Sequence, residues 1–165
     1  YRSEVNLQAL DWLETVSDRL HQGYILTIDY GYSAQRYYSP TRTQGTLQCY
    51  YQHGHHSNPY LAIGRQDITA HVNFTALEQW GEQFGLQNMG LTQQGLFLMA
   101  LGLGDRLSAL SNSDQSLQNI LSRRESLHAL MNPMGLGNFG VLIQSKGLKV
   151  TQHNQPLTGL SAPML

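Results

Sequence analysis

The chain has 165 residues, the length of one domain, with 41% hydrophobic and 13% charged residues. A formal net charge of −1 excludes the strong positive field that draws proteins to nucleic acid or to anionic membranes. The single cysteine, Cys49, excludes an internal disulfide, and no apolar run reaches the roughly 18 residues of a membrane span.

The first predicted elements are a helix and a strand. Apolar residues fall on one helical face at steps of four, three and four: Ala9, Leu13, Val16 and Leu20. This spacing predicts a helix over 7–21, with Asn6 as its N-cap. The short apolar run 24–30 then predicts a buried strand. A strand that follows a helix this closely indicates an α/β layer structure.

The middle of the chain alternates loops, strands and helices. Residues 31–45 are expected to be loop, and residues 46–52 a strand. Asn73 is positioned to cap a helix over 74–84, and a weak strand is expected over 86–91. Residues 92–104 predict a further helix, capped by Thr92.

The last third begins with a polar break at 111–115. Residues 116–131 predict a helix with a broad apolar face, and residues 139–148 predict a strand. No repeat and no low-complexity linker interrupts the chain, so residues 1–165 are expected to form a single domain or half of one. The chain opens on Tyr1 rather than on Met, and we expect a trimmed chain or a piece of a longer protein.

Three histidines within four positions, His53, His55 and His56, raise the question of a metal site. His53 with His55, or His53 with His56, could chelate a metal ion, and His71 could add a distant ligand. However, no cysteine stands at ligand spacing and no H-E-x-x-H helix is present. We therefore expect a polar active-site loop without a metal, and a metal-dependent hydrolase is the weaker alternative.

The segment "GLGNFG", residues 135–140, matches the dinucleotide pattern G-x-G-x-x-G. That fingerprint requires a strand before it and a helix after it, so that the helix N-terminus meets the pyrophosphate. Here a predicted helix comes before it and a predicted strand after it. The pattern therefore predicts a helix-to-strand turn.

Acidic and imidazole side chains suggest two further positions for chemistry. Asp29 ends the predicted strand 24–30, and ligands of open α/β sheets bind beyond the carboxyl ends of strands. Asp67, Thr69 and His71 alternate, and would share one face if extended. Such a row could orient a substrate or move a proton. The alternatives are an Asp29 that only caps the next segment and an edge strand with a solvated face.

Four segments together resemble the C-terminal part of the MidA-type S-adenosylmethionine-dependent methyltransferases. They are "ILTIDYGY", "YYSPTRTQGTLQCYYQHGHHSNPYLAIGRQDITAHVNFTAL", "GLTQQGLFLMALGL" and "LMNPMGLGNFGVLIQSKGL". This family includes bacterial proteins and the mitochondrial protein-arginine methyltransferase that assists assembly of respiratory complex I. The resemblance runs over essentially the whole chain in the same order. It implies the C-terminal portion of a class I, Rossmann-like fold, with a partial sheet, flanking helices and residues 24–30 as the fifth strand.

The resemblance also implies a set of site residues. Those expected to take part in catalysis are Asp67, His71 and Asp29. Those expected to bind substrate are Tyr30, Gly31, Arg42, His53, His56 and Thr69. His55 is expected to be incidental. Ile63 stands where the family commonly has Pro, and Asn73 where it commonly has Asp, so an acidic role at position 73 is in doubt.

The family's glycine-rich cofactor loop has no counterpart in these residues. We therefore expect the S-adenosylmethionine-binding residues to lie mainly in a missing N-terminal part, and this fragment to be inactive alone. We expect that part as a partner, with a protein substrate as methyl acceptor, and otherwise association with a second copy. No nucleic acid and no membrane span are expected. The expected location is the cytoplasm in a bacterium or the mitochondrial matrix in a eukaryote. A non-enzymatic binding or assembly module is the leading alternative.

Overall fold

The computed structural model describes residues 1–111 and 116–161, and it confirms the α/β class. Its main sheet has the order β1–β8–β7, with β1 over Gly23–Asp29, β8 over Gly140–Lys146 and β7 over Gln87–Gln93. Both outer strands are antiparallel to β8, so β1 and β7 run in the same direction. β8 therefore lies antiparallel between two strands that are parallel to each other, in a partial sheet with flanking helices as the resemblance implied.

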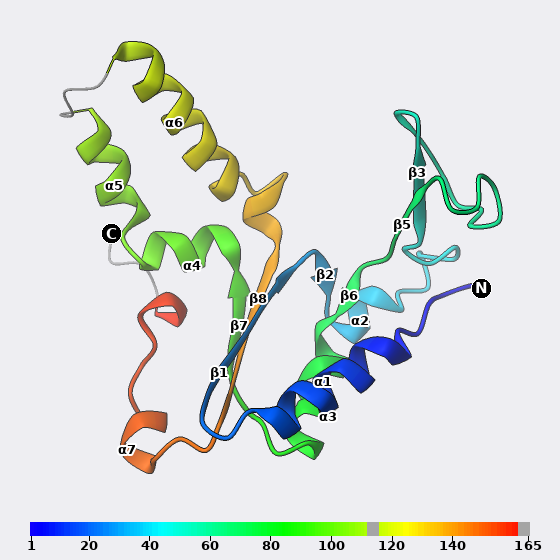
Figure 1. Cartoon of the computed structure of the whole chain (residues 1–165), viewed down its shortest axis with the longest axis horizontal. Coiled ribbons are helices and arrows are strands. Elements are labelled where there is room, and N and C mark those ends of the chain that lie inside the picture. The colour runs from blue at the N-terminus through cyan, green and yellow to red at the C-terminus, as the bar shows by residue number, and fades with distance from the viewer. Residues whose placement is uncertain (112–115, 162–165) are drawn as a thin grey trace.

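Two helices cover one face of this sheet (Figure 1). They are α1, Leu7–Arg19, and α3, Phe74–Gln83, and both begin as predicted. Asn6 Oδ1 accepts a hydrogen bond from the Ala9 amide at 3.1 Å, and Asn73 Oδ1 accepts one from the Ala76 amide at 3.2 Å. The core lies between these helices and the sheet. It contains Leu13, Ile25, Phe74, Leu77, Leu86 and Leu142.

Beyond the end of β1 the chain forms two small sheets. The segment expected to be loop instead contains β2, Gly31–Tyr32, and α2, Ala34–Tyr37. β2 pairs in parallel with β6, Val72–Asn73. The second small sheet has the order β4–β3–β5 and projects from the body of the molecule (Figure 1). Its strands are β3, Gln48–Tyr51, β4, Gly54–His56, and β5, Asp67–Thr69.

At the other end, the helices of residues 94–110 and 117–131 project from the main sheet (Figure 1). The predicted helix 92–104 is wrong as one element, because Thr92 belongs to β7 and Gly102, with φ 84°, separates two helices. These are α4, Gln94–Ala100, and α5, Leu103–Leu110. The predicted polar break lies outside the described residues over 112–115.

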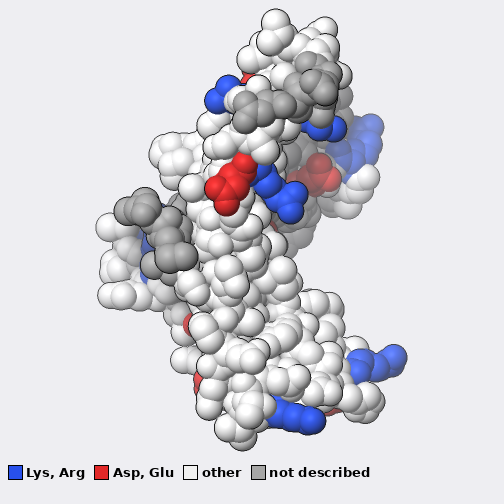
Figure 2. All heavy atoms as spheres, turned by 90° about the vertical axis from the view of Figure 1, so that its left-hand side faces the viewer, with Lys and Arg blue, Asp and Glu red and all other residues white. Residues whose placement is uncertain are grey.

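Helix α6, Leu117–Met131, has Ser116 as its N-cap and forms as predicted, but its apolar face is only partly covered. Leu117 is 79% exposed and Leu121 59% exposed. Charged side chains of both signs gather at this end of the molecule (Figure 2), where Arg106, Arg123, Arg124 and Glu125 lie. The chain then passes through η1, Leu136–Asn138, into β8, and ends with α7, Val150–His153, and η2, Thr158–Leu160. No described helix is long and apolar enough to cross a membrane.

One edge and one face of β1 are open among the described residues. β1 pairs only with β8, so its other edge has no partner strand there. Tyr24, Leu26 and Ile28 alternate along the strand and point away from the α1–α3 layer, and each is exposed. Ile25, on the opposite face, is buried. β1 therefore presents an apolar surface that the described residues leave uncovered.

The close approach of α3 to β8 depends on Gly81. Gln144, on β8, is fully buried, and its Nε2 donates to the Leu77 carbonyl at 3.1 Å and to Asn88 Oδ1 at 2.9 Å. A Cβ at Gly81 would lie 2.1 Å from this nitrogen. The Gly81→Ala substitution should therefore displace Gln144 and lower the free energy of unfolding of the full-length protein by about 1–3 kcal/mol. Urea unfolding followed by circular dichroism measures this change.

Gly104→Ala is the matched control. Gly104 also lies in a helix, but the nearest atom to its added Cβ is Met99 Cε at 3.6 Å, an ordinary contact. This substitution should leave the stability unchanged or raise it by up to about 1 kcal/mol. Equal losses at the two positions would show that the approach of α3 to Gln144 is not the cause.

Candidate functional site

The candidate site begins where β1 ends and the chain turns away from the main sheet. Gly31 follows Asp29 and Tyr30 and starts β2. A Cβ at Gly31 would lie 2.3 Å from the Val72 carbonyl oxygen, so only glycine allows β2 and β6 to pair here. This pairing brings the segment that contains His71 next to the carboxyl end of β1.

A pocket of about 610 Å³ opens at this point. Its lining comes from the end of β1, the 42–50 segment and the β5–β6 connection. The lining residues are Tyr30, Arg42, Gly45, Thr46, Gln48, Tyr50, Thr69 and His71. They offer hydroxyl groups, one guanidinium and one imidazole, a combination that suits a polar ligand more than an apolar one.

His71 is held at the pocket by aromatic contacts and by its backbone. Its ring stacks on the Tyr32 ring with centroids 4.7 Å apart and meets the Tyr30 ring edge-on at 5.1 Å. Its amide donates to Thr46 Oγ1 at 3.0 Å. Its Nδ1 is buried and has no hydrogen-bond partner among the described residues, so neither tautomer is fixed by a protein group there.

The electrostatic surroundings favour a neutral His71. Burial lowers the pKa of His71 most, and the Arg42 guanidinium lowers it further. The carboxylates of Asp29 and Glu4 act in the opposite direction, but the pKa remains below the ordinary histidine value. At neutral pH the ring therefore retains one nitrogen that can accept a hydrogen bond.

Glu4 fixes the segment on which this pocket depends. Its carboxylate accepts hydrogen bonds from the Thr46 amide at 2.9 Å, the Leu47 amide at 3.0 Å and the Thr46 hydroxyl at 3.2 Å, and one from the Tyr37 hydroxyl at 3.4 Å. Burial raises the pKa of Glu4, but the hydrogen bonds from the amides outweigh it and leave the pKa below its ordinary value. Glu4 is therefore an ionised anchor behind Thr46.

Two arginines meet at the Tyr32 ring. The Arg36 Cζ lies 4.6 Å and the Arg42 Cζ 4.4 Å from the ring centroid, which is the range of cation–π contacts. Arg42 Nη1 also donates to the carbonyls of Arg36 and Tyr37. Arg36 and Tyr32 line a second pocket of about 410 Å³, beside Gly31 and Phe74. The two pockets thus lie next to the same aromatic ring.

Asp29 lies near His71 but outside the lining of the main pocket. Its Oδ1 accepts a hydrogen bond from the Tyr30 amide at 2.7 Å, so it supports the turn at the end of β1. Its charge still reaches His71, because it raises the pKa of that imidazole. The geometry therefore agrees with the alternative of a capping role and leaves a direct catalytic role as a proposal.

Asp67, Thr69 and His71 do not form the continuous row that their alternation suggested. β5 ends at Thr69 and β6 begins at Val72, and the two strands belong to different sheets. Thr69 and His71 both line the main pocket. Asp67 is exposed, opposite Tyr50 in the β3–β5 pairing, and is not among the lining residues.

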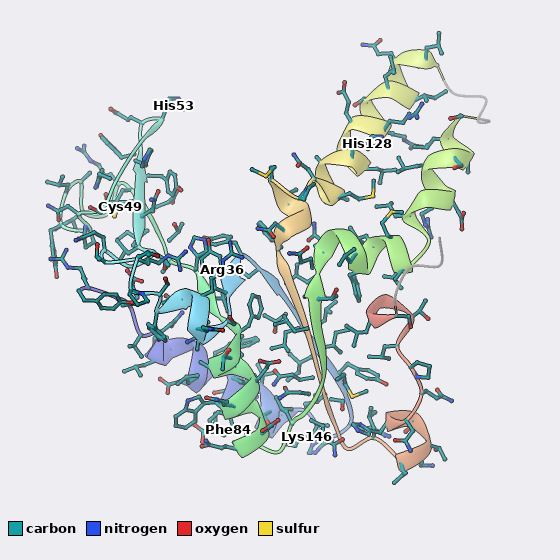
Figure 3. The ribbon with its side chains drawn as sticks, turned by 180° about the vertical axis from the view of Figure 1, so that it is seen from behind. Arg36, Cys49, His53, Phe84, His128 and Lys146 are labelled. Carbon is teal, nitrogen blue, oxygen red and sulfur yellow. The ribbon has the colours of Figure 1, made fainter. Side chains whose placement is uncertain are left out.

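The three histidines lie on a β-hairpin rather than in an irregular loop. Gln52 and His53 form its two-residue turn, and both have positive φ, at 45° and 64°, as in a type I′ turn. Figure 3 shows His53 at the far end of this hairpin, away from Arg36. His55 is exposed, and His56 Nδ1 accepts a hydrogen bond from the Asn58 amide at 3.3 Å. None of the three lines the main pocket.

Two expectations about other sites can be compared directly with the structure. Residues 135–140 form the predicted helix-to-strand turn, since η1 lies between α6 and β8. Within residues 1–111 and 116–161, no group of three or more His, Cys, Asp or Glu side chains is placed to hold a metal ion. Cys49 is fully buried in β3.

Sequence reasoning missed the roles of Glu4, Tyr32 and Arg36. Glu4 precedes the first helix and contacts residues that lie 42 and 43 positions along the chain, so no local pattern connects them. Tyr32 and Arg36 stood in a segment interpreted as loop. The useful signal was the density of tyrosine and arginine over 30–42, which is typical of aromatic and cationic recognition surfaces.

Comparisons with known proteins agree with this fold. The structure superposes with a TM-score of 0.84 on an uncharacterised COG1565 superfamily protein from Burkholderia thailandensis, at 34% sequence identity. It superposes with a TM-score of 0.85 on a second COG1565 superfamily member from the same organism, bound to S-adenosyl-homocysteine, at 33% identity. The alignments cover 95% and 96% of this chain, and the chain spans 40% of the length of each neighbour.

No curated protein matches the chain. Residues 1–92 match the family model described as "Putative S-adenosyl-L-methionine-dependent methyltransferase". Since this match spans more than half of the chain, the chain belongs to this S-adenosyl-L-methionine-dependent methyltransferase family.

Proposed function

We propose that this chain forms the acceptor side of an S-adenosylmethionine-dependent methyltransferase, and that the rest of a longer protein supplies most of the cofactor site. The observation that carries the proposal is the polar pocket at the carboxyl end of β1, where a neutral His71 faces hydroxyl groups and Arg42. Family membership identifies the reaction class, and the pocket indicates which residues receive the methyl acceptor.

The described residues do not by themselves fit the cofactor. The only G-x-G-x-x-G match, residues 135–140, runs from a helix into a strand, so no glycine loop stands before a helix N-terminus there. When bound, S-adenosylmethionine supplies an activated methyl group for in-line displacement. The residues of this chain then have the task of binding and orienting the acceptor.

The uncovered side of β1 supports the proposal that another segment of the longer protein covers this strand. Tyr24, Leu26 and Ile28 are 45%, 51% and 42% exposed, which is unusual for three apolar residues on one face of a strand in a core sheet. An unpaired edge beside them is a template for another strand. We propose that residues of the longer protein pair with this edge, and that residues 1–165 are half of a domain.

We propose that His71 accepts a hydrogen bond from the substrate group that is methylated. A nucleophilic nitrogen needs its lone pair aimed at the methyl carbon. A hydrogen bond from its N–H group to a fixed imidazole provides that orientation. The stacked Tyr32 ring and the Thr46 contact to its amide hold His71 in place. Tyr30 and Thr69 offer further polar contacts in the same pocket, and Asp29 supports the turn beneath them.

Protein arginine is the proposed acceptor, following the resemblance to MidA-type enzymes. The polar lining of the pocket supports this choice, because the neutral His71 ring and the hydroxyl groups of Tyr30 and Thr69 can accept hydrogen bonds from the N–H groups of a guanidinium. The small sheet β4–β3–β5 and its turns carry His53, His56 and Asp67, and we propose that this sheet contacts the protein substrate outside the pocket.

A non-enzymatic assembly module is the second candidate. Tyr60 is 80% exposed and Ile63 75% exposed, both on the segment between β4 and β5, and exposed apolar side chains of this size suit contact with another protein. This candidate predicts a partner but no cofactor.

Cofactor binding decides between the two candidates. Calorimetric titration of the full-length protein with S-adenosylmethionine should show one saturable site. A well-folded protein that binds none at millimolar ligand would overturn the enzyme proposal and favour the assembly module.

Replacement of His71 tests the acceptor pocket. His71→Ala should lower the rate of methyl transfer by at least about tenfold while changing S-adenosylmethionine affinity less than about twofold. His55→Ala is the matched control, because His55 is exposed on the hairpin and should leave the rate unchanged. Radiolabelled methyl transfer to protein substrate measures both variants. Equal losses for both would remove His71 from the mechanism.

The pH dependence of activity follows from the sign of the pKa shift. The neutral ring is the active form, so activity exists above the pKa of His71 and is lost as the pH falls through it. Since burial and Arg42 hold that pKa below its ordinary value of about 6.5, the acidic loss of kcat/KM should have its midpoint below about 6.5. A profile from pH 5 to 9 measures it. A midpoint that is unchanged in His71→Asn would contradict the assignment.

A further inference from the structure

Arg36 and Arg42 form a pair of cations without a matching anion. Both guanidinium groups lie within 5 Å of the Tyr32 ring centroid, at 4.6 and 4.4 Å. Neither makes an ion pair with a carboxylate of the described residues. Two like charges at one ring repel each other, and the carboxylates whose charges reach His71, those of Asp29 and Glu4, form no ion pair with either guanidinium.

The donors of this pair are available and partly oriented. Arg42 uses Nη1 for the carbonyls of Arg36 and Tyr37, which fixes the plane of its guanidinium and leaves Nε and Nη2 without a protein acceptor among the described residues. Arg36 makes no side-chain hydrogen bond to a described residue. A fixed guanidinium with free N–H groups matches the two oxygens of a carboxylate.

The position of the pair connects it to the acceptor pocket. Arg42 lines the main pocket together with His71, and Arg36 lines the second pocket together with Tyr32. The pair therefore stands beside the Tyr32–His71 stack, between the two pockets. Arg36 itself belongs to α2, where Figure 3 labels it. A group bound to both guanidiniums would lie next to whatever occupies the main pocket.

The charge distribution indicates a single carboxylate rather than a polyanion. The chain has a formal net charge of −1, with ten Lys and Arg residues against eleven Asp and Glu residues. Nucleic acid binding would require a basic stripe that follows many phosphates. Two cations at one point suit one anionic group of a protein chain.

We propose that Arg36 and Arg42 bind an acidic side chain of the protein substrate that adjoins the methyl-accepting residue. The proposal rests on the function proposed above and adds a specificity: substrates with Glu or Asp beside the accepting residue. The carboxylate also neutralises the cation pair once the substrate is bound, so that the substrate supplies the anion that the described residues lack.

Peptide binding to the full-length protein tests this proposal. The probes are fluorescein-labelled peptides GSGEREGSG, GSGQRQGSG and GSGKRKGSG, measured by anisotropy with S-adenosyl-homocysteine present. The Glu peptide should bind at least about tenfold more tightly than the Gln peptide, and the Lys peptide most weakly. Arg36→Gln should remove most of that preference without changing the affinity for the Gln peptide by more than about twofold. Arg42→Gln should also remove most of the preference, and because Arg42 lines the acceptor pocket it should weaken binding of the Gln peptide as well.

Arg65→Gln is the matched control. Arg65 also lies over a tyrosine, with its Cζ 5.9 Å from the Tyr51 ring centroid, but it lines neither pocket. This variant should keep the preference for the Glu peptide. Arg36→Gln keeps the test valid if Arg42→Gln disturbs the fold, because Arg36 makes no side-chain hydrogen bond that the local structure needs.

Three results would overturn the proposal, and each differs from failure of the proposed function. Equal affinity for the Glu and Gln peptides would exclude an acidic substrate group. Loss of S-adenosylmethionine affinity in both arginine variants would assign the pair to the methionine carboxylate of the cofactor. A lower melting temperature in Arg36→Gln would assign it to a carboxylate elsewhere in the protein. The proposed function instead fails if wild-type protein binds no S-adenosylmethionine.

Discussion

The hydrogen bonds to the Glu4 carboxylate hold the candidate site together. Glu4 accepts hydrogen bonds from two backbone amides, those of Thr46 and Leu47. It also accepts one from the Thr46 hydroxyl, and the oxygen of that hydroxyl accepts a hydrogen bond from the His71 amide. One carboxylate thereby joins the N-terminal segment, the 42–47 turn and the β5–β6 connection. Gly45 shows how tight this contact is, because a Cβ there would lie 2.1 Å from Glu4 Oε1 and its φ is 75°. The hydrogen bonds lower the pKa of Glu4, so this stabilisation is present at neutral pH and lost only as acid protonates the carboxylate.

Local sequence patterns predicted those helices and strands whose formation depends on residues that are close in sequence. The helices that begin at Asn6 and Asn73 and the buried strand of residues 140–146 followed from caps and apolar periodicity. The pairing of β2 with β6 did not, because it depends on contacts between distant segments. The break at Gly102 was missed although its signal is local, a glycine with positive φ between two helices. The same limit applies to the site. His71, Thr69, Tyr30 and Arg42 were expected to act on substrate and do line one pocket, whereas the contacts of Glu4 across 42 residues had no local signature.

The stack of Tyr32 and His71 connects the two electrostatic features of the site. The ring of Tyr32 contacts two guanidinium groups and the imidazole, so the cations and the histidine share one rigid platform. Arg42 lowers the pKa of His71, and an anion bound to the arginine pair would reduce that effect. Binding of an acidic substrate group and the basicity of His71 are therefore linked. The ring becomes a better proton acceptor when such a substrate is in place.

The open side of β1 places a constraint on this chemistry. The carboxyl end of β1 forms one wall of the pocket, and the same strand has an unpaired edge and three exposed apolar side chains. Charge interactions in a pocket open to water are screened, and they become strong only when water is excluded. A segment that pairs with β1 would cover the apolar face and close the site beside Tyr30 in the same step. Completion of the sheet and activation of the pocket are thus one structural event, since the strand that ends at Asp29 takes part in both.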